Sequence, residues 1–161
     1  MKKSEYNELF DLGISLRDQG IYLRDSENSE GSKLKFMEAA KIFELLYPIE
    51  VQDDKFNKTL LLGSLYKWLG HIDKAFEMFL KGVTLNPDSE LASLSLYLSY
   101  VDLDKSDLAI EEISRFLKAH SAVLYKDTLS ELLLDVEANR LPRFKSRILE
   151  LARMNEVSSP L

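Results

Sequence analysis

The sequence predicts an all-α protein of about eight helices, and three observations support this fold class. Gly and Pro are scarce, with 6 and 4 residues, while helix-forming residues are plentiful. Apolar residues recur at helical spacing nearly throughout, and the breaks between them are short. A chain of 161 residues with 45% hydrophobic positions is long enough for one domain with a substantial core.

We expect the helices to form four antiparallel hairpins. The predicted ranges are 3–24 with 33–47, 56–69 with 72–85, 88–103 with 106–119, and 123–138 with 142–155. Gly70 fits the end of the third helix, and Asp73 suits the dipole at the start of the fourth. Pro87 and Pro142 fit the first turns of the fifth and last helices, where proline is tolerated.

The segment RDSENSEGSK, at positions 24–33, contains no large apolar residue. Ser, Asn and Gly favour turns, so we expect an exposed loop between the first two helices. A solvated insertion is favoured over a mobile functional loop. The tail at 157–161, VSSPL, is expected to fray.

Composition excludes several classes of function. A net charge of -6 and a pI near 5.0 argue against a nucleic-acid surface, which needs a clustered basic face. The absence of cysteine excludes disulfides, a thiolate nucleophile and a Cys-based zinc site. MKKSEYNELF at the start lacks the apolar core of a secretory signal, and no stretch approaches a membrane span. We therefore expect a cytoplasmic protein without a cofactor.

Self-comparison reveals an internal repeat. With a shift of 34 residues, similar residues coincide at five positions: Leu62 and Leu96, Tyr66 and Tyr100, Ala75 and Ala109, Phe79 and Ile113, and Lys81 and Arg115. Asp73 and Asp107 each precede the alanine by two positions. A helical chain with this period is typical of stacked tetratricopeptide units.

Positions 56–89 resemble a tetratricopeptide repeat (TPR). The matching residues are Leu62, Gly63, Tyr66, Gly70, Ala75, Phe79 and Pro87. Thr59 stands at the usual tryptophan position, and Gly82 replaces a later alanine. The resemblance implies a short TPR solenoid in a single domain, with repeats at 6–55, 56–89 and 90–123 and an atypical capping hairpin at 124–156.

Packing explains the matched residues without reference to the family. Gly63 and Ala75 have almost no side chain, so the two helices of this hairpin can approach closely there. We expect Leu62, Tyr66 and Phe79 to fill the space around that contact. These residues are therefore predicted to belong to the core.

The other copies depart from this pattern. In the first copy, Leu12, Gly13 and Gly20 match the opening helix, and Ala39 and Phe43 match the second. The spacing between its halves is longer by fourteen residues, which we assign to the polar loop. In the third copy Tyr97 and Asp104 replace the packing glycine and the turn glycine, so that hairpin is expected to be more open.

The TPR resemblance assigns four positions in each first helix to a concave, protein-binding surface. They are Asn7, Phe10, Ile14 and Arg17, then Asn57, Leu60, Ser64 and Lys67, then Leu91, Leu94, Leu98 and Val101. The last four could form an exposed groove, be covered by the fourth hairpin or the polar loop, or make a homodimer face. Trp68, next to the second set, could be core or an anchor for a partner.

The residues at the predicted binding positions also limit the class of ligand. The carboxylate clamp of chaperone-binding TPR proteins needs Lys and Asn, where this sequence has Phe10, Ile14, Leu61 and Leu91. An extended segment with hydrophobic anchors is therefore the expected ligand. Positions 40–117 more loosely resemble the class II chaperones of bacterial type III secretion, which implies a small cytosolic chaperone for a hydrophobic client protein.

Two other classes of function stay open. One is an immunity or regulatory protein that inactivates a toxin or enzyme through its acidic surface, around Glu111 and Glu112. The pair Asp53-Asp54, like Glu111 and Glu112, is expected to be solvated charge.

The remaining class is an enzyme, which would need His71 or His120 to act in catalysis. No metal-binding, phosphate-binding or nucleophile motif accompanies these histidines. Each follows a predicted helix, so we expect both to interact with terminal carbonyl groups instead.

Overall fold

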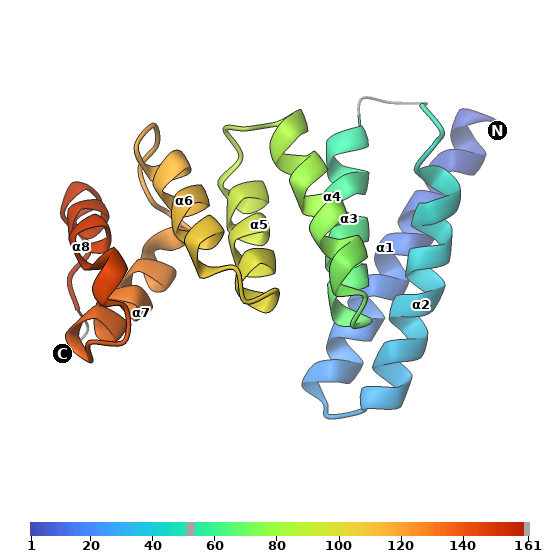
Figure 1. Ribbon diagram of the computed structural model, residues 1–161. Coiled ribbons are helices and arrows are strands. Elements are labelled where there is room, and N and C mark those ends of the chain that lie inside the picture. The colour runs from blue at the N-terminus through green and yellow to red at the C-terminus, as the bar shows by residue number, and fades with distance from the viewer. Residues whose placement is uncertain (51–53, 160–161) are drawn as a thin grey trace. The chain divides into compact units, whose positions relative to one another are not determined.

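The computed structural model describes residues 1–50 and 54–159, and within them it contains eight α-helices and no strand (Figure 1). The helices are α1 (Lys3–Asp25), α2 (Ser29–Leu46), α3 (Lys55–Trp68), α4 (Ile72–Leu85), α5 (Glu90–Asp102), α6 (Ser106–Leu117), α7 (Tyr125–Glu137) and α8 (Lys145–Met154), with a short 3-10 helix, η1 (Pro142–Phe144), before α8. The prediction of an all-α fold is confirmed. None of the described helices is long and apolar enough to cross a bilayer.

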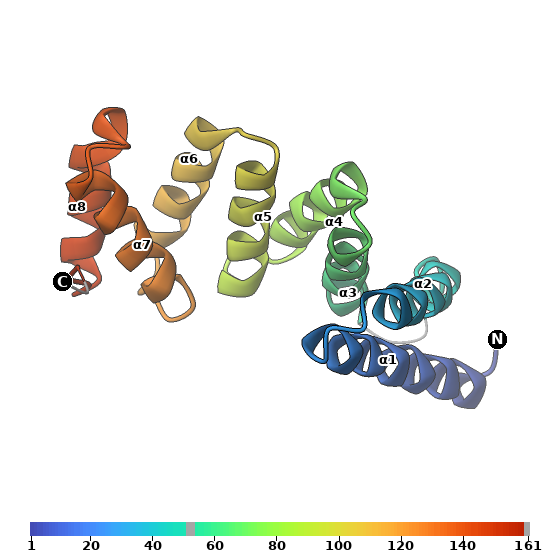
Figure 2. The same cartoon turned by 90° about the horizontal axis from the view of Figure 1, so that it is seen from below.

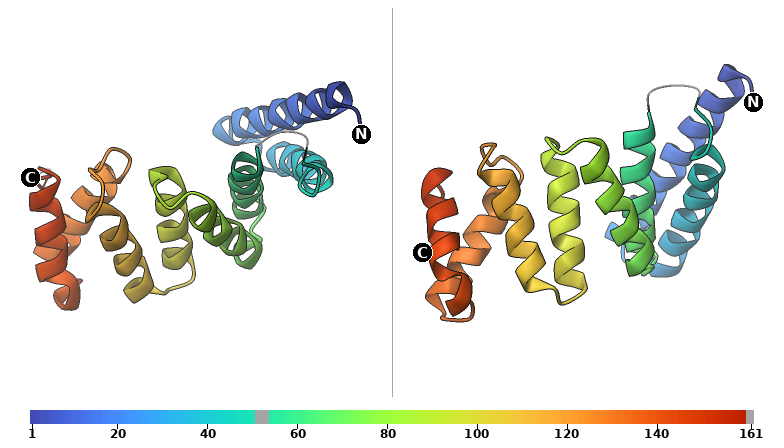
Figure 3. Two further views of the ribbon diagram at one scale, coloured as in Figure 1. Left: turned by 90° about the horizontal axis from the view of Figure 1, so that it is seen from above. Right: turned by 45° about the horizontal axis from the view of Figure 1, so that its top comes forward.

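The chain divides into two compact units, Met1–Leu85 and Asn86–Leu161. In the first unit, α1 packs against α2 and α3 against α4, and α2 joins the two hairpins by packing against α3 (Figure 2). In the second unit, α5 packs against α6 and α7 against α8, which also contacts α6 (Figure 3). Each unit is therefore a pair of helical hairpins.

The exposed loop predicted at 24–33 is much shorter than expected. Helix α1 continues to Asp25 and α2 begins at Ser29, so only residues 26–28 separate them. The side chain of Asn28 accepts a hydrogen bond from the backbone N–H of Gly31 at 3.0 Å and caps α2. Most of the polar segment is helical because this cap and the first turn of α2 use its small polar residues.

The second hairpin closes around a glycine and an aromatic ring, as expected. A Cβ atom on Gly63 would lie 2.6 Å from the ring of Phe79, so only glycine allows this approach of α3 and α4. The first hairpin contains the same contact. A Cβ atom on Gly20 would lie 2.5 Å from the ring of Phe36, which follows Gly20 at the sequence distance that separates Gly63 from Phe79.

Gly20 is therefore a buried residue within α1, inside the range predicted for the first helix. The extra length of the first hairpin adds a second contact layer, in which the ring of Phe43 lies 2.9 Å from a Cβ atom on Gly13. Gly13 and Gly20 are one heptad apart, as are Phe36 and Phe43, so each helix is longer by about two turns. The fourteen additional residues lengthen both helices and form no loop.

All four hairpins turn through one residue in the left-handed region. These residues are Glu27, Gly70, Asp104 and Asn139, with φ of 62°, 78°, 56° and 55°. At Asp104 the N–H of the next residue, Lys105, donates to the carbonyl of Tyr100 at 2.8 Å, as the N–H of His71 donates to Tyr66 after Gly70. The third turn therefore closes like the second although it lacks glycine, and Asp104 does not open it.

The core of the second unit extends to the end of the described chain. Its buried side chains come from all four helices and from the segment between α6 and α7: Tyr97, Ala109, Ile110, Ile113, Phe116, Leu117, Ala122, Tyr125, Leu129, Leu132, Leu133, Val136, Ile148, Leu151 and Ala152. Val157 packs against this core, and Ser159 donates a hydrogen bond to Glu137 at 3.1 Å. The predicted fraying is therefore wrong for 157–159, while 160–161 lie outside the described residues.

Candidate functional site

The first unit has a cavity of about 360 Å³ where α1 meets the start of α3. It is lined by Tyr6, Asn7, Phe10, Asp11, Asp54 and Asn57. The ring of Phe10 lies between two aromatic neighbours, with its centroid 6.2 Å from that of Tyr6 and 5.4 Å from that of Phe43 on α2. The cavity therefore combines an aromatic wall with two carboxamides and two carboxylates.

A buried lysine fixes the α3 side of this cavity. Lys58 is 1% exposed and donates hydrogen bonds to the backbone carbonyls of Leu46 at 3.0 Å and Ile49 at 2.6 Å. Its Nζ also lies 3.1 Å from Oδ1 of Asp54, the residue before α3. Three interactions thus satisfy the ammonium group and bind the start of α3 to the end of α2.

Asp54 is also held from the α1 side. The hydroxyl of Tyr6, which is 1% exposed, donates a hydrogen bond to Oδ2 of Asp54. Burial, and then the hydrogen bond and the charge of Asp54, raise the pKa of Tyr6 well above its ordinary value. Asp54 was expected to be solvated, and this is wrong because Tyr6 and Lys58 enclose its carboxylate. Asp53 lies outside the described residues.

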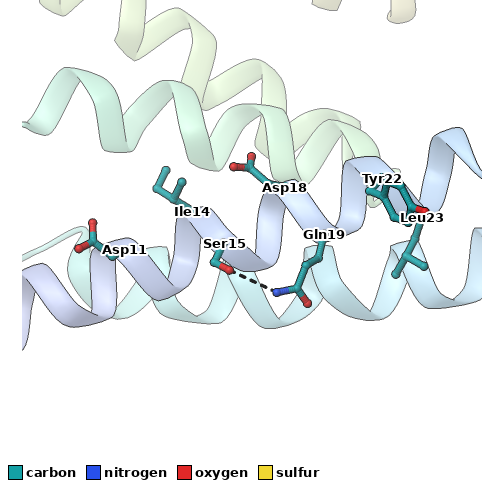
Figure 4. A pocket seen from close by; sticks show the side chains of 7 residues that line it. All are labelled: Asp11, Ile14, Ser15, Asp18, Gln19, Tyr22 and Leu23. Atoms are coloured by element: carbon teal, nitrogen blue, oxygen red, sulfur yellow. Dashed lines mark hydrogen bonds between the residues drawn. The ribbon is translucent and has the colours of Figure 1, made fainter.

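A second, larger hollow of about 740 Å³ runs along α1. Its lining residues all belong to that helix: Asp11, Ile14, Ser15, Asp18, Gln19, Tyr22 and Leu23 (Figure 4). The amide of Gln19 donates a hydrogen bond to the hydroxyl of Ser15 at 3.2 Å, one turn away. Asp11 lines both cavities, so the two hollows meet at this carboxylate.

On α1, three of the four predicted binding residues line these cavities. Asn7 and Phe10 line the smaller one and Ile14 lines the larger. Arg17 lines neither, because its guanidinium donates two hydrogen bonds to Oδ1 of Asp18, at 2.8 and 2.7 Å. The predicted residues of α1 thus lie along one side of the helix.

On α3 the prediction holds less well. Asn57 is exposed and lines the smaller cavity with Asn7 and Phe10. Leu60 is only 8% exposed and lines neither cavity, so little of its side chain is accessible. Ser64 and Lys67 are partly exposed and line neither cavity.

The four predicted residues of α5 belong to the second unit. Leu91, Leu98 and Val101 are 53%, 39% and 49% exposed, so the fourth hairpin, which belongs to the same unit, does not bury them. Leu94 is partly buried against the core of this unit. Within its own unit, α5 therefore presents an apolar stripe of three exposed residues.

Trp68 is half-buried at the end of α3. Its ring centroid lies 4.7 Å from that of Phe36, and the guanidinium of Arg24 lies 5.5 Å above the ring. These three residues line a separate cavity of about 370 Å³ beside the hairpin turns. Trp68 is thus largely occupied by contacts within the protein.

Glu112 is the clearest failure of the sequence prediction. It was expected to be solvated, but it is 7% exposed and accepts a hydrogen bond from the hydroxyl of Ser93 at 2.6 Å. The guanidinium of Arg115 donates to both its carboxylate oxygens, at 2.9 and 2.7 Å, and the hydroxyl of Tyr125 lies 2.9 Å from that of Ser93. Glu111 is exposed, as expected.

The imidazole rings of the two histidines make contacts that the sequence did not predict. Nε2 of His120 lies 3.2 Å from Oδ1 of Asp88, and its ring stacks on Phe116 with a centroid distance of 4.6 Å. The ring of His71 contacts Tyr66 edge-on at 6.3 Å. Both imidazoles therefore interact with side chains, while the backbone N–H groups of His71 and His120 donate to the carbonyls of Tyr66 at 2.8 Å and Phe116 at 3.0 Å, at the ends of α3 and α6.

Sequence reasoning missed Asp11, Ser15 and Asp18, which line the same face of α1 as the predicted residues. Their spacing of three and four positions could have indicated a continuous polar face. Within residues 1–50 and 54–159, no group of three or more His, Asp or Glu residues is placed to hold a metal ion. The sequence has no match to a family model and no significant match to a curated protein, so interpretation depends on these residues alone.

Proposed function

We propose that this protein is a non-enzymatic binding module, a small cytoplasmic chaperone or adaptor that holds an extended, partly hydrophobic segment of a client protein. One observation carries the proposal. Asn7 and Phe10 of α1 and Asn57 of α3, far apart in sequence, line one cavity that continues into the hollow beside Ile14. All four residues are expected to bind a partner from their positions in the repeat.

The chemistry of this surface suits a peptide backbone with apolar side chains. A carboxamide both donates and accepts, so the exposed Asn57 matches the N–H and C=O groups of an extended segment. Phe10 and Ile14 offer apolar contact beside it. From Asn7 to Leu23, α1 spans about 24 Å, the length of roughly seven residues of extended peptide.

Local packing supports membership of the TPR class as part of this proposal. Gly63 with Phe79 and Gly20 with Phe36 close two hairpins in the same way. Each of the four hairpin turns contains one residue in the left-handed region. The finer proposal, a chaperone like those of type III secretion, rests on the looser resemblance of positions 40–117. In the second unit, the exposed Leu91, Leu98 and Val101 would provide a further apolar contact for the client.

The alternative of an immunity or regulatory protein has less support. It requires an exposed acidic surface around Glu111 and Glu112, and the carboxylate of Glu112 is instead buried and paired with Arg115. Reversing the charge at Glu112 would disturb the packing of the second unit whether or not a toxin or an enzyme binds there. Only Glu111 of this pair is available to a toxin or an enzyme.

Affinity capture from the native cytosol tests the proposal. Wild type is compared with the double variant Ile14→Asp/Asn57→Ala and with Leu34→Asp, which adds a charge at a 54% exposed residue of α2 outside both cavities. The double variant should lose its captured clients and Leu34→Asp should retain them, with all three equally helical by circular dichroism. Equal capture of the same proteins by all three would rule the proposal out.

A further inference from the structure

Asp11 differs from the other carboxylates of the two cavities. Asp18 is paired with Arg17 at 2.7 Å, and Asp54 is paired with Lys58 at 3.1 Å. Asp11 is exposed and lies in both linings, and among the described residues no basic group is within ion-pair distance of it. The meeting point of the two hollows thus carries a negative charge that the protein itself does not neutralise.

The other charged residues that line the two cavities are also negative. In the part of the chain that the structure describes, no basic residue lines either cavity, whereas Asp11, Asp18 and Asp54 do. The ammonium of Lys58 lies behind Asp54, at 1% exposure, and cannot reach a ligand in the cavity. The chain as a whole has a net charge of -6, which attracts cations from a distance. An acidic segment would find no partner on this surface.

Apolar groups flank Asp11 along the helix. Phe10 precedes it, and Ile14 follows three positions later on the same face. The side chains of lysine and arginine have an apolar stem and a charged head, so a stem could lie on Phe10 or Ile14 while the head pairs with Asp11. The arrangement therefore fits one cationic side chain between apolar neighbours.

We propose that Asp11 is the specificity residue of this surface and binds a lysine or arginine side chain of an extended client segment whose neighbouring residues are apolar. This inference rests on the proposed function, since it assigns the charge of the segment held beside α1. The inference requires a client segment that is both basic and apolar, whereas the proposed function requires only an extended, partly hydrophobic segment.

Three fluorescent peptides of about nine residues, long enough to span the α1 surface, test this inference. They alternate leucine and serine and differ only at the central residue, which is lysine, glutamine or glutamate. Their dissociation constants are measured by fluorescence anisotropy at about 0.15 M salt, which screens long-range attraction. The proteins are wild type, Asp11→Asn and Glu77→Gln, which removes one charge from an exposed position of α4 outside both cavities.

Wild type and Glu77→Gln should bind the lysine peptide about fivefold more tightly than the glutamine peptide, and the glutamate peptide most weakly. Asp11→Asn should bind the lysine and glutamine peptides equally. Equal affinity of wild type for these two peptides would overturn the inference, as would a lysine preference that survives in Asp11→Asn or falls equally in Glu77→Gln. In those cases binding of the glutamine peptide would still support the proposed function, whereas no binding of any peptide would overturn both.

Discussion

The ring of Phe36 fills the space next to Gly20, so that a Cβ atom on Gly20 would lie 2.5 Å from Cε1 of Phe36. The ring cannot easily move away, because Phe36 is 2% exposed and packs on Trp68 with a centroid distance of 4.7 Å. We therefore predict that Gly20→Ala destabilises the protein by about 1 to 2 kcal/mol, since the clash outweighs the better helix propensity of alanine.

Urea unfolding would measure this effect, and a double-mutant cycle would assign it to the pair. In a Phe36→Leu background, whose smaller side chain leaves room, Gly20→Ala should be close to neutral or stabilising. An equal loss of stability in both backgrounds would show that the contact with Phe36 is not the cause.

At the turn through Asp104 we predict a substitution that stabilises the protein. Asp104 has φ of 56°, a conformation that glycine adopts without the steric cost of a side chain. Asp104→Gly should therefore stabilise the protein by about 0.5 to 1 kcal/mol, whereas Gly70→Ala, at φ of 78°, should destabilise it by about 1 kcal/mol. Glu111→Gly, within α6, is the control and should also destabilise, by about 1 kcal/mol. Chemical denaturation of the three variants distinguishes a turn effect from a general effect of glycine.

Lys58 is predicted to be the most sensitive lysine in the first unit. Lys58→Met removes the donor to the carbonyls of Leu46 and Ile49 and the ion-pair partner of Asp54, which should cost about 3 to 5 kcal/mol. Lys55→Met is the matched control, because Lys55 is 52% exposed and pairs only loosely with Glu50, at 3.7 Å. Its effect should stay below about 0.5 kcal/mol.

If Lys58→Met does not fold, Asp54→Asn provides the milder test, since it keeps the side-chain size and removes only the negative charge. It should lower the denaturation midpoint while circular dichroism still reports a helical protein. Equal midpoints for Lys58→Met and Lys55→Met would contradict the role assigned to the buried ammonium group.

From the raised pKa of Tyr97 we predict how the free energy of unfolding changes at alkaline pH. Burial, with the nearby charges of Glu131 and Asp135, raises the pKa of Tyr97 to about 12 from the ordinary value of 10.0. Between these pH values the unfolded chain loses the phenolic proton while the folded chain keeps it, so the free energy of unfolding falls as pH rises. The contribution of Tyr97 to this loss should be about 2 to 3 kcal/mol across the interval.

Tyr97→Phe has no phenolic proton to lose, so it should lose less stability than wild type between pH 10 and pH 12. Urea midpoints at pH 9, 11 and 12 would show the difference, and Tyr22→Phe, at a 72% exposed site, is the control. Parallel loss of stability in Tyr97→Phe and wild type would exclude this tyrosine as a cause.

The sequence was sufficient for the fold class and for the second hairpin, because glycine, alanine and proline determine local backbone geometry and helix approach. It assigned the fourteen extra residues of the first hairpin to a loop for an identifiable reason. Gly20 was compared with Gly70, a turn residue, whereas its true counterpart is Gly63, which faces Phe79 as Gly20 faces Phe36. The two possibilities differ by one heptad, which leaves the face of the helix almost unchanged, so periodicity could not separate them.

The residues of the candidate site were likewise predictable from the sequence only in part. Repeat position alone identified Asn7, Phe10 and Asn57, since a residue's face on a helix follows from its spacing. Tertiary structure decided that Leu60 is buried, that Asp54 and Glu112 are enclosed, and that Asp11 joins two cavities. The physical reason is that burial and ion pairing depend on side chains from other helices, such as Tyr6 beside Asp54 and Ser93 beside Glu112, which no local pattern contains.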